Sequence, residues 1–596
     1  MRRSLTLIVF ISMMVAFAFA PAFADDWETY YEKSGCKATP RYEETIDYCQ
    51  RLAQASPWIH YTTFGITPQG RDLPLLIVDR MGRIDAASVR KTDHAVLLIQ
   101  AGIHSGEIDG KDAGLMLMRD LAVTKKYELL LDHVTILFMP IFNVDGHERF
   151  GRYNRINQNG PEEMGWRVTA QNVNLNRDYL KADSPEMQDW LRLFVEWLPD
   201  FFVDCHVTDG ADYQYALTYG LEILGSMDPG ITRWTSDVYL KRIEQMMADS
   251  GFPISPYVIF KRRHEPKSGL VSWIAPPRLS EGYSALQNRS GLLVETHMLK
   301  DYKTRVDATY QMLVHTTALL NEQHRELTRL NQQADRLAAS KEFRQEPFAM
   351  SFNSTSDSTI IEFLGYDYEV IDSDLTGGPW HKYSKEPITI EVPYFNTQVP
   401  AVTAMLPEAY IVPAEWQEVI ERIELHGIAV RRLSRPEDIC VKSYKFKDVH
   451  WSENPYEGRH TVRFEQEEIE EVRTFPAGSA VIDMKQRAAR VAAHILEPEA
   501  PDSFVYWDFF ATIFERKEYT ETYVMEAMAR DMLAADENLQ LEFDRALAAD
   551  STLGGDQWRI LNWFYERTPY WDDRKDVYPV GKIFERSVVD AITSVD

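Results

Sequence analysis

Between about residues 40 and 325, short apolar runs alternate with amphipathic helical stretches. This alternation is typical of an α/β domain with a largely parallel or mixed sheet. The run 95–99 is apolar at every position, which indicates a strand that helices cover on both faces. The predicted strands are 94–100, 134–140, 201–207 and 291–296, and the predicted helices are 110–121, 184–197 and 232–247. We therefore expect a mixed, largely parallel central sheet with helices on both faces.

The second half of the chain has a different pattern. A long helical stretch, 306–338, closes the first region, and we place a domain boundary near residue 345. Beyond it we predict strands at 360–370 and 388–393, then helices at 414–426, 519–535 and 539–548. A chain of 596 residues exceeds what one hydrophobic core usually spans. We expect one domain over 25–345 and a C-terminal accessory region over 346–596, β-rich and then mixed, whose role no motif identifies.

The N-terminus has the features of an export signal. Arg2 and Arg3 precede the apolar stretch 5–19, and the small-residue pattern 22–24 follows. This order predicts a signal peptide over 1–24 and a secreted or periplasmic protein. An uncleaved anchor is the alternative, but the Ala-Phe-Ala pattern before acidic residues favours cleavage. No later segment approaches the run of about 20 apolar residues that crosses a bilayer.

Charge and cysteine content exclude some partners. Acidic residues outnumber basic ones, 91 to 64, for a formal net charge of −27. This argues against nucleic-acid or anionic-membrane partners, which need a basic patch. Cys36 and Cys49 could close a small disulfide loop in an oxidising compartment, and the sequence leaves this open. We expect Cys205 to be a buried, inert thiol, and nothing in the sequence fixes the oligomeric state.

Two segments carry metal-ligand chemistry. His104 and Glu107 form a H-x-x-E pattern that follows an apolar strand and opens into a helix, which places it in the crevice where α/β sheets bind ligands. Alone this pattern is weak, because a surface ion pair looks the same. His206 ends a second apolar strand. Two imidazoles and one carboxylate leave a position open on tetrahedral Zn²⁺, the arrangement of a catalytic zinc.

Further charged residues occur at a strand end and in the segment that precedes His206. Glu295 ends an almost wholly apolar strand, where a buried charge is costly without a metal or cation nearby. Pairing with a buried arginine is the structural alternative for this residue. Arg167 and Arg177 add guanidinium groups, which bind carboxylates bidentately and stabilise oxyanions.

Taken in order, these motifs resemble the zinc carboxypeptidase family typified by carboxypeptidase A. The similarity rests on H-x-x-E at 104–107, N-x-D-G at 143–146, Asn-Arg at 176–177, and the strand ends at His206 and Glu295. It covers about residues 40–325, and the motifs are specific when taken jointly.

The resemblance implies a metallocarboxypeptidase that binds one Zn²⁺ and acts on the C-termini of peptides or proteins. The implied roles are metal binding by His104, Glu107 and His206; general base and acid for Glu295; oxyanion stabilisation by Arg167; carboxylate binding by Asn176 and Arg177; and substrate capping by Tyr283. Arg155 is a rival for the oxyanion role, and we prefer Arg167 because Trp-Arg leads into the Asn-Arg motif as it does in the family.

Two positions depart from the family pattern. Asn174 stands where the family commonly has an aspartate that orients the first zinc histidine. Gly106 stands where the digestive enzymes carry an arginine that lines the cleft. Basic, aromatic and acidic side-chain preferences all remain open. The competing functions are a zinc amidase or carboxypeptidase acting on cell-wall peptides, and a non-catalytic module that binds peptide ends.

Overall fold

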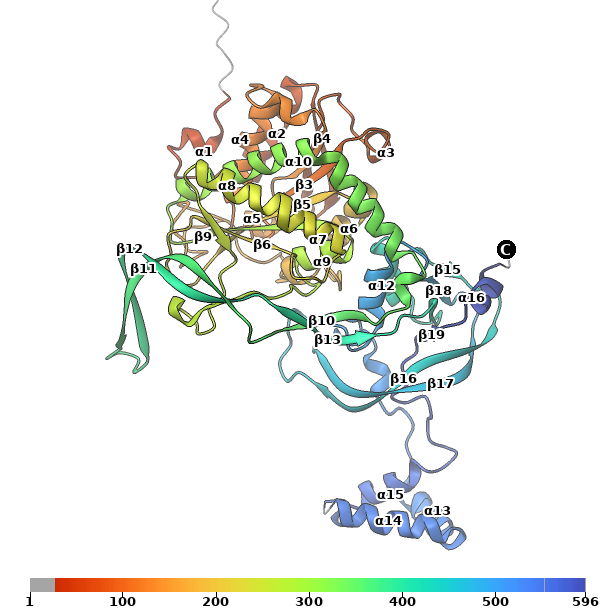
Figure 1. The fold of residues 1–596 in the computed structure, drawn as a ribbon. Coiled ribbons are helices and arrows are strands. Elements are labelled where there is room, and N and C mark those ends of the chain that lie inside the picture. The colour runs from red at the N-terminus through yellow and green to blue at the C-terminus, as the bar shows by residue number, and fades with distance from the viewer. Residues whose placement is uncertain (1–26, 551, 595–596) are drawn as a thin grey trace, which may run out of the picture.

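The computed structural model describes residues 27–550 and 552–594, and the predicted signal peptide at 1–24 lies outside these residues. An α/β body carries two projections (Figure 1). One is the hairpin of β11 (Thr359–Asp372) and β12 (Pro379–Phe395), and the other is the group of helices α13 (Thr522–Ala535), α14 (Glu537–Ala549) and α15 (Gln557–Tyr565). Within the described ranges, no helix is both long and apolar enough to cross a membrane.

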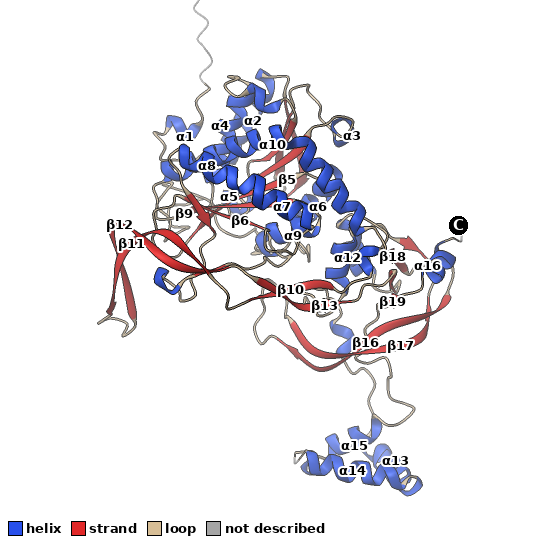
Figure 2. Cartoon of the chain, in the orientation of Figure 1, coloured by secondary structure: helices blue, strands red, loops and turns tan. Residues whose placement is uncertain are grey.

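An eight-stranded mixed sheet forms the centre of the first half (Figure 2). Its spatial order is β1 (Ile59–Ile66), β2 (Asp72–Val78), β4 (Val134–Met139), β3 (Ala95–Ala101), β5 (Phe201–Thr208), β9 (Ser290–His297), β6 (Leu217–Leu221) and β7 (Ile254–Pro256). The central strands β4, β3, β5 and β9 run parallel to one another, whereas the pairs β1–β2, β2–β4 and β9–β6 are antiparallel and the pair β6–β7 is parallel. The predicted fold class is confirmed.

Each face of this sheet is buried in its own hydrophobic core. Leu97 and Ile99 of β3 contribute to one core, whereas their neighbours Val96 and Leu98 contribute to the other. The first core contains α2 (Tyr42–Ala55), α4 (Asp109–Ala122), α8 (Lys241–Asp249) and α10 (Tyr302–Ala338). The second contains α6 (Pro185–Trp197) and α9 (Ser280–Leu286). Alternating burial follows from the alternation of side chains along a strand.

Local signals set several helix ends. The Ser184 hydroxyl accepts a hydrogen bond from the Met187 N–H, and Pro185 occupies the first position of α6. Asp301 caps α10 by accepting from the Thr304 N–H. Both arrangements satisfy N–H groups that a helix start leaves unpaired. The predicted helix 232–247 is formed by α7 (Pro229–Trp234), a π-helical turn (Thr235–Leu240) and α8.

The second half is β-rich and then mixed, as expected. A two-stranded sheet joins β10 (Phe348–Ser354) to β13 (Gln398–Ala404), and a three-stranded sheet joins β11 (Thr359–Asp372), β12 (Pro379–Phe395) and β8 (Leu270–Val271). A six-stranded sheet has the order β15 (Arg431–Arg432), β18 (Ala480–Asp483), β14 (Ala409–Val412), β19 (Gly581–Ile583), β16 (Glu437–Trp451) and β17 (Val462–Phe475). The helices of the second half are α11 (Gln417–Leu425), α12 (Ala489–Leu496), α13 (Thr522–Ala535), α14 (Glu537–Ala549), α15 (Gln557–Tyr565) and α16 (Arg586–Thr593).

The boundary proposed near residue 345 lies between α10 and β10, but packing crosses it. The core that contains Leu98 and Trp190 also contains Ile420 of α11 and Val491 of α12. Arg459 donates two hydrogen bonds to the Asp183 carboxylate, at 2.7 and 2.8 Å. The two halves therefore share one hydrophobic core rather than meeting at a polar surface.

The cysteines are unpaired. Cys36 and Cys49 are free thiols, so the structure answers the open question about this disulfide in the negative. Cys205 is buried on β5, as expected, and burial raises the pKa of its thiol.

Candidate active site

Three central strands bring the metal-binding candidates together at their carboxyl ends. β3 ends at Ala101, and the chain turns at Gly102, whose φ of 69° favours glycine, before His104 and Glu107. His206 lies near the end of β5, where it pairs in register with Glu295 of β9. The polar groups therefore gather in the crevice that parallel strands form at this edge.

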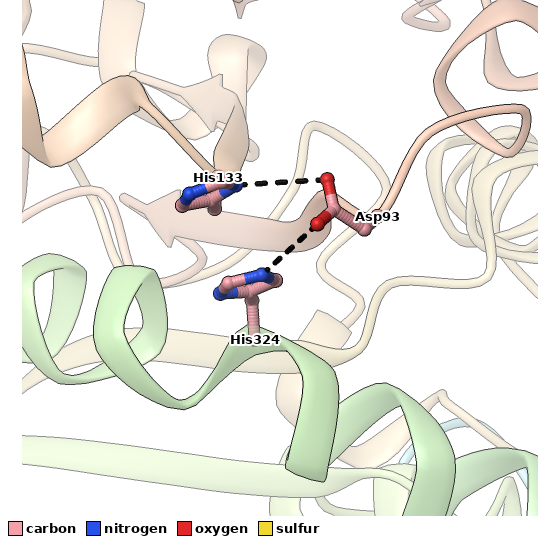
Figure 3. A group of neighbouring side chains, drawn as sticks. All are labelled: Asp93, His133 and His324. Atoms are coloured by element: carbon pink, nitrogen blue, oxygen red, sulfur yellow. Dashed lines mark hydrogen bonds and ion pairs between the residues drawn. The ribbon is translucent and has the colours of Figure 1, made fainter.

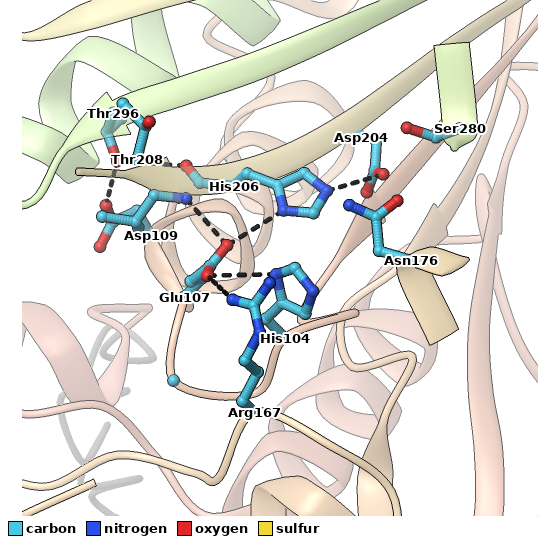
Figure 4. Close-up of polar contacts among 12 residues, drawn as sticks. His104, Glu107, Asp109, Arg167, Asn176, Asp204, His206, Thr208, Ser280 and Thr296 are labelled. Atoms are coloured by element: carbon cyan, nitrogen blue, oxygen red, sulfur yellow. Dashed lines mark hydrogen bonds and ion pairs between the residues drawn. The ribbon is translucent and has the colours of Figure 1, made fainter. Parts of the chain in front are cut away.

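The imidazole rings converge on the Glu107 carboxylate. His104 Nδ1 lies 3.1 Å from Oε1, and His206 Nδ1 lies 3.0 Å from Oε2. Figure 4 shows the two rings beside Glu107, with Asp204 and Asn176 close to His206. The ligand atoms of these three buried residues all lie within 4.8 Å of one another.

This group fits a zinc ion. His104 Nδ1 is buried and makes no hydrogen bond, which leaves its lone pair free for a metal. Burial lowers the pKa of His104 to about 4, so the ring is neutral at pH 7. Two imidazole nitrogens and one carboxylate are the donor set of a catalytic zinc with an open coordination position.

The opposite nitrogens of both rings are held by hydrogen bonds. Asn174 Oδ1 lies 3.0 Å from His104 Nε2, and Asp204 Oδ2 lies 2.8 Å from His206 Nε2. Each contact places Nε2–H as the donor and turns Nδ1 towards Glu107. Asn174 therefore contacts His104, the first zinc histidine, as the family pattern leads us to expect of the residue at this position. Sequence reasoning missed Asp204, although alternation along β5 places it on the same face as His206.

Two arginines reach Glu107. Arg155 Nη1 lies 2.8 Å and Arg167 Nη1 3.2 Å from the same oxygen, Oε1. The Arg155 side chain is 12% exposed, whereas that of Arg167 is 44% exposed. A Cβ on Gly106 would lie 2.4 Å from Arg155 Cδ, so the glycine makes room for this arginine. Arg155 is thus enclosed, and Arg167 is accessible from the solvent.

Glu295 is a buried carboxylate that can accept a further hydrogen bond. Its Oε2 atom is buried and makes no hydrogen bond. Burial, the largest cause, raises the pKa of Glu295 to about 8, and the charges of Glu107 and Glu281 act in the same direction. A carboxylate in this environment is suited to accept and return a proton.

Asn176 lies beside the metal-binding group, and Arg177 follows it. Asn176 belongs to a short 3-10 turn (Leu175–Arg177), and its Oδ1 atom is buried without a partner. Arg177 is partly exposed, and its guanidinium donates to the Asn176 carbonyl at 2.6 Å.

Tyr283 lies away from these residues, which corrects the capping role expected of it. The ring is fully buried in the core that both halves share. Its hydroxyl lies 2.9 Å from His426 Nδ1 and accepts a hydrogen bond from Gln287 at 2.8 Å. A tyrosine held in this way cannot cap a substrate.

A side-chain pocket opens beside Glu295. Leu293 lies two residues before Glu295 on β9, so both side chains point to the same face of the sheet. Across from Leu293, Gly220 of β6 has no side chain, and a Cβ there would lie 3.2 Å from Leu293 Cδ2. Other residues that line the pocket include Tyr219, Glu222, Tyr257, Trp273, Glu281 and Tyr394. The sequence did not predict this pocket, because its residues are scattered from β6 to β12.

A second group with metal-ligand atoms within 4.8 Å occurs among the described residues, formed by Asp93, His133 and His324 (Figure 3). The two rings stack at 4.1 Å with an interplanar angle of 7°, so one ion could not lie in both ring planes. Asp93 is already paired with Arg325 at 3.0 Å. This arrangement is explained as an ion-pair cluster on the surface, and the catalytic metal belongs to the first group.

Comparisons with known proteins agree with a zinc site formed by His104, Glu107 and His206. Residues 45–196 match the sequence profile of the family described as zinc carboxypeptidase. Carboxypeptidase 2 of Trichophyton rubrum is 25% identical over 505 residues, covering 81% of this chain and 87% of that protein. Carboxypeptidase 2 of Trichophyton tonsurans is 23% identical over 524 residues, with the same coverage. A solved metallo-carboxypeptidase from Burkholderia cenocepacia aligns at 16% identity and a TM-score of 0.35, covering 47% of this chain and 70% of that one.

The profile match and the histidine and glutamate group define a zinc-dependent peptide hydrolase. More specifically, residues 45–196 match the zinc carboxypeptidase family, and the cofactor is one Zn²⁺. The expected family, enzyme class and metal are confirmed.

Proposed function

We propose that the protein removes single residues from the C-termini of peptides and prefers a basic terminal side chain. The observation that carries this proposal is the convergence of His104, Glu107 and His206 beside Glu295, next to a pocket that contains an unpaired acid.

His104, Glu107 and His206 would hold the zinc ion. When bound there, zinc supplies a Lewis acid that polarises the scissile carbonyl and lowers the pKa of an attacking water. Glu295 accepts the proton from that water and passes it to the nitrogen of the leaving amine, so it ends the cycle in its starting state. Its position in register with His206 and its unpartnered Oε2 support this role.

Arg167 is our candidate for stabilising the oxyanion. Its guanidinium reaches the metal-binding carboxylate and stays accessible, whereas Arg155 is enclosed over Gly106. Guanidinium donors fixed near a developing negative charge lower its energy in the transition state. Arg155 is better suited to hold Glu107 in place.

Asn176 and Arg177 are our candidates for binding the substrate's terminal carboxylate. The Asn176 side-chain amide, which lies beside the metal-binding group, and the partly exposed Arg177 guanidinium support this assignment. An amide and a guanidinium together can bind both carboxylate oxygens. This clamp would restrict cleavage to the last peptide bond.

The pocket favours a basic side chain in the substrate. Glu281 accepts one hydrogen bond, from Ser280 at 3.2 Å, and no lysine or arginine of the described residues forms an ion pair with it. Burial is the main cause of its raised pKa, and a bound cation would favour its charged form. Glu222 differs, because its Oε1 atom accepts three backbone N–H bonds.

Export to the periplasm or the medium is part of the proposal. It rests on the pattern of residues 1–24, and mass spectrometry of the N-terminus of the natively produced protein would test it.

The test is release of terminal residues from a peptide library, with and without chelator and added Zn²⁺. We expect chelator-sensitive release of single residues, led by lysine and arginine, and strongly reduced cleavage of amidated peptides. Equal cleavage of free and amidated peptides would contradict the terminal clamp. Release from cell-wall peptides but from no linear peptide would replace the proposed substrate.

Glu281→Gln tests the side-chain preference, with Glu222→Gln as a matched control in the same pocket. We expect Glu281→Gln to reduce kcat/KM for lysine-ended relative to alanine-ended peptides by about tenfold, because one charge pair is lost. The control should keep the wild-type ratio. An unchanged ratio in Glu281→Gln would show that the pocket does not select basic residues.

A further inference from the structure

One rim of the side-chain pocket is held by the second half of the chain. The rim segment 270–273 begins with β8, which pairs in parallel with β12 through Leu270 and Val271. The Ser272 N–H donates to the Phe395 carbonyl at 2.9 Å. Its own carbonyl accepts from Gln398 at 2.8 Å and from the Ser354 hydroxyl at 3.1 Å.

These contacts come from three different strands of the accessory half. Ser354 lies at the end of β10, Phe395 at the end of β12 and Gln398 at the start of β13. A two-residue strand such as β8 has few hydrogen bonds of its own, so its position depends on these partners. The accessory half therefore helps to position the rim, together with the Ile259 carbonyl of the catalytic half, which accepts from the Val271 N–H at 2.8 Å.

Tyr394 of β12 goes further and lines the pocket itself. Its hydroxyl lies 2.5 Å from Ser272 Oγ, which ties the ring to the rim. Tyr219 and Tyr257 from the catalytic half line the same pocket. Aromatic faces attract cations and cover the apolar stems of lysine and arginine.

We infer that the accessory half supplies a wall of the pocket and that Tyr394 is a specificity-determining residue, which selects the terminal side chain of the substrate. This inference rests on the proposed carboxypeptidase function and gives residues 346–596 a part in it. Tyr394 has no place in the bond-breaking steps, so its effect should appear in substrate binding.

The hairpin has contacts with the catalytic half besides those of Tyr394. Phe363 and Val392 of β11 and β12 are buried in a cluster with Tyr213 and Leu270 of the catalytic half, and Tyr394 packs only against the edge of this cluster. Gln214 adds hydrogen bonds to the Gly365 and Ile388 carbonyls, at 2.8 and 3.0 Å. Truncation of the Tyr394 ring should therefore change the pocket and leave the fold intact.

The experiment compares Tyr394→Ala, Tyr394→Phe and the control Tyr368→Ala in the full-length, zinc-loaded enzyme. Tyr368 lies on the same hairpin but does not line the pocket. Steady-state kinetics are measured on peptides that differ only in a C-terminal lysine, arginine, leucine or alanine. Zinc content and thermal unfolding are measured in parallel.

We expect Tyr394→Ala to lower kcat/KM for the lysine and arginine peptides about tenfold relative to the alanine peptide, mainly through KM. Tyr394→Phe keeps the ring. Its fall in relative kcat/KM for the lysine and arginine peptides should therefore be less than half of the fall in Tyr394→Ala. The control should keep the wild-type ratio, and all variants should retain zinc.

Three other results would overturn the inference: an unchanged order of preference in Tyr394→Ala, a uniform fall across all four peptides, or the same change in Tyr368→Ala. Failure of the wild-type enzyme to cleave any of the peptides would instead contradict the proposed function. The two failures are therefore distinguishable.

Discussion

The two halves of the chain differ in what their polar residues do. In the first half, His104, Glu107, His206 and Glu295 lie close together at strand ends, and two of their atoms, His104 Nδ1 and Glu295 Oε2, lack hydrogen-bond partners among the described residues. In the second half, charges pair across an exposed hairpin, as Lys442 does with Glu468. Reactive groups are concentrated in one half, whereas the other half contributes packing and a pocket wall.

This difference shows that catalytic and structural boundaries need not coincide. The metal-binding residues all precede residue 345, yet the core behind them continues into α11 and α12. The second face of the sheet is covered by α6 and α9, and α11 of the accessory half packs against α6. Each prediction below tests this division of roles, from the largest expected effect to the smallest.

Truncation after residue 345 should abolish the native fold. It would expose the apolar side chains of α6 and the sheet that pack against Ile420 and Val491. Burial of such side chains contributes about 1.5 to 3 kcal/mol each, and net stability is about 5 to 15 kcal/mol. Circular dichroism and thermal melting of the purified fragment provide the measurement.

An internal deletion of 517–572, closed by a short glycine-serine linker, is the matched control. The three helices α13 to α15 have their own hydrophobic cluster around Met525 and Phe564. The chain enters and leaves this group at adjacent points, because the Asp576 N–H donates to the Ile513 carbonyl at 3.0 Å. We expect this variant to fold and bind zinc. A folded, active fragment of residues 1–345 would contradict the claim that the first half depends on the second half for its core.

Glu295→Gln should lower kcat by about 10² to 10⁴-fold, because glutamine cannot accept and return the proton. The metal-binding group does not include Glu295, so zinc content should match that of the wild type. Stopped assays on a good substrate, with zinc measured by mass spectrometry, give both readouts. Full activity in a zinc-loaded variant would remove Glu295 from the mechanism.

The sequence predicted the parts of the molecule in which local pattern and fold agree. The predicted strand 201–207 is β5 (Phe201–Thr208), because a run of apolar residues can be buried only in a central strand. The long hairpin of β16 and β17 was not predicted, since a glutamate-rich run such as 465–471 does not resemble a buried strand. Pairing with β19, more than 100 residues away, also leaves no local signal.

The error at Tyr283 has a simple geometric origin. Tyr283 and Glu281 lie two residues apart on α9, so their side chains point in directions about 200° apart around the helix axis. Glu281 therefore faces the pocket while Tyr283 faces the core. The sequence alone does not show which face of α9 each residue occupies.

Asp204→Asn tests the asymmetry between the two metal-binding histidines, since His206 is held by a carboxylate and His104 by an amide. Asparagine can still accept the His206 hydrogen bond but supplies no charge, so zinc affinity should fall about 10 to 100-fold. The reciprocal variant, Asn174→Asp, should bind zinc more tightly. Competition with a chromogenic chelator measures both, and equal affinities in all three proteins would show that these partners do not tune the metal.

Tyr283→Phe should produce the smallest effect, in stability alone. Loss of the hydroxyl leaves His426 Nδ1 and the Gln287 amide without their shared partner, which costs about 1 to 3 kcal/mol of unfolding free energy. KM and kcat should stay unchanged, because the ring lies in the core. Tyr257→Phe provides the contrast, since Tyr257 lines the pocket and its hydroxyl bonds only Thr208, at 3.3 Å. Denaturant unfolding and kinetics of the pair separate the roles: a raised KM in Tyr283→Phe with unchanged stability would return that residue to the substrate site.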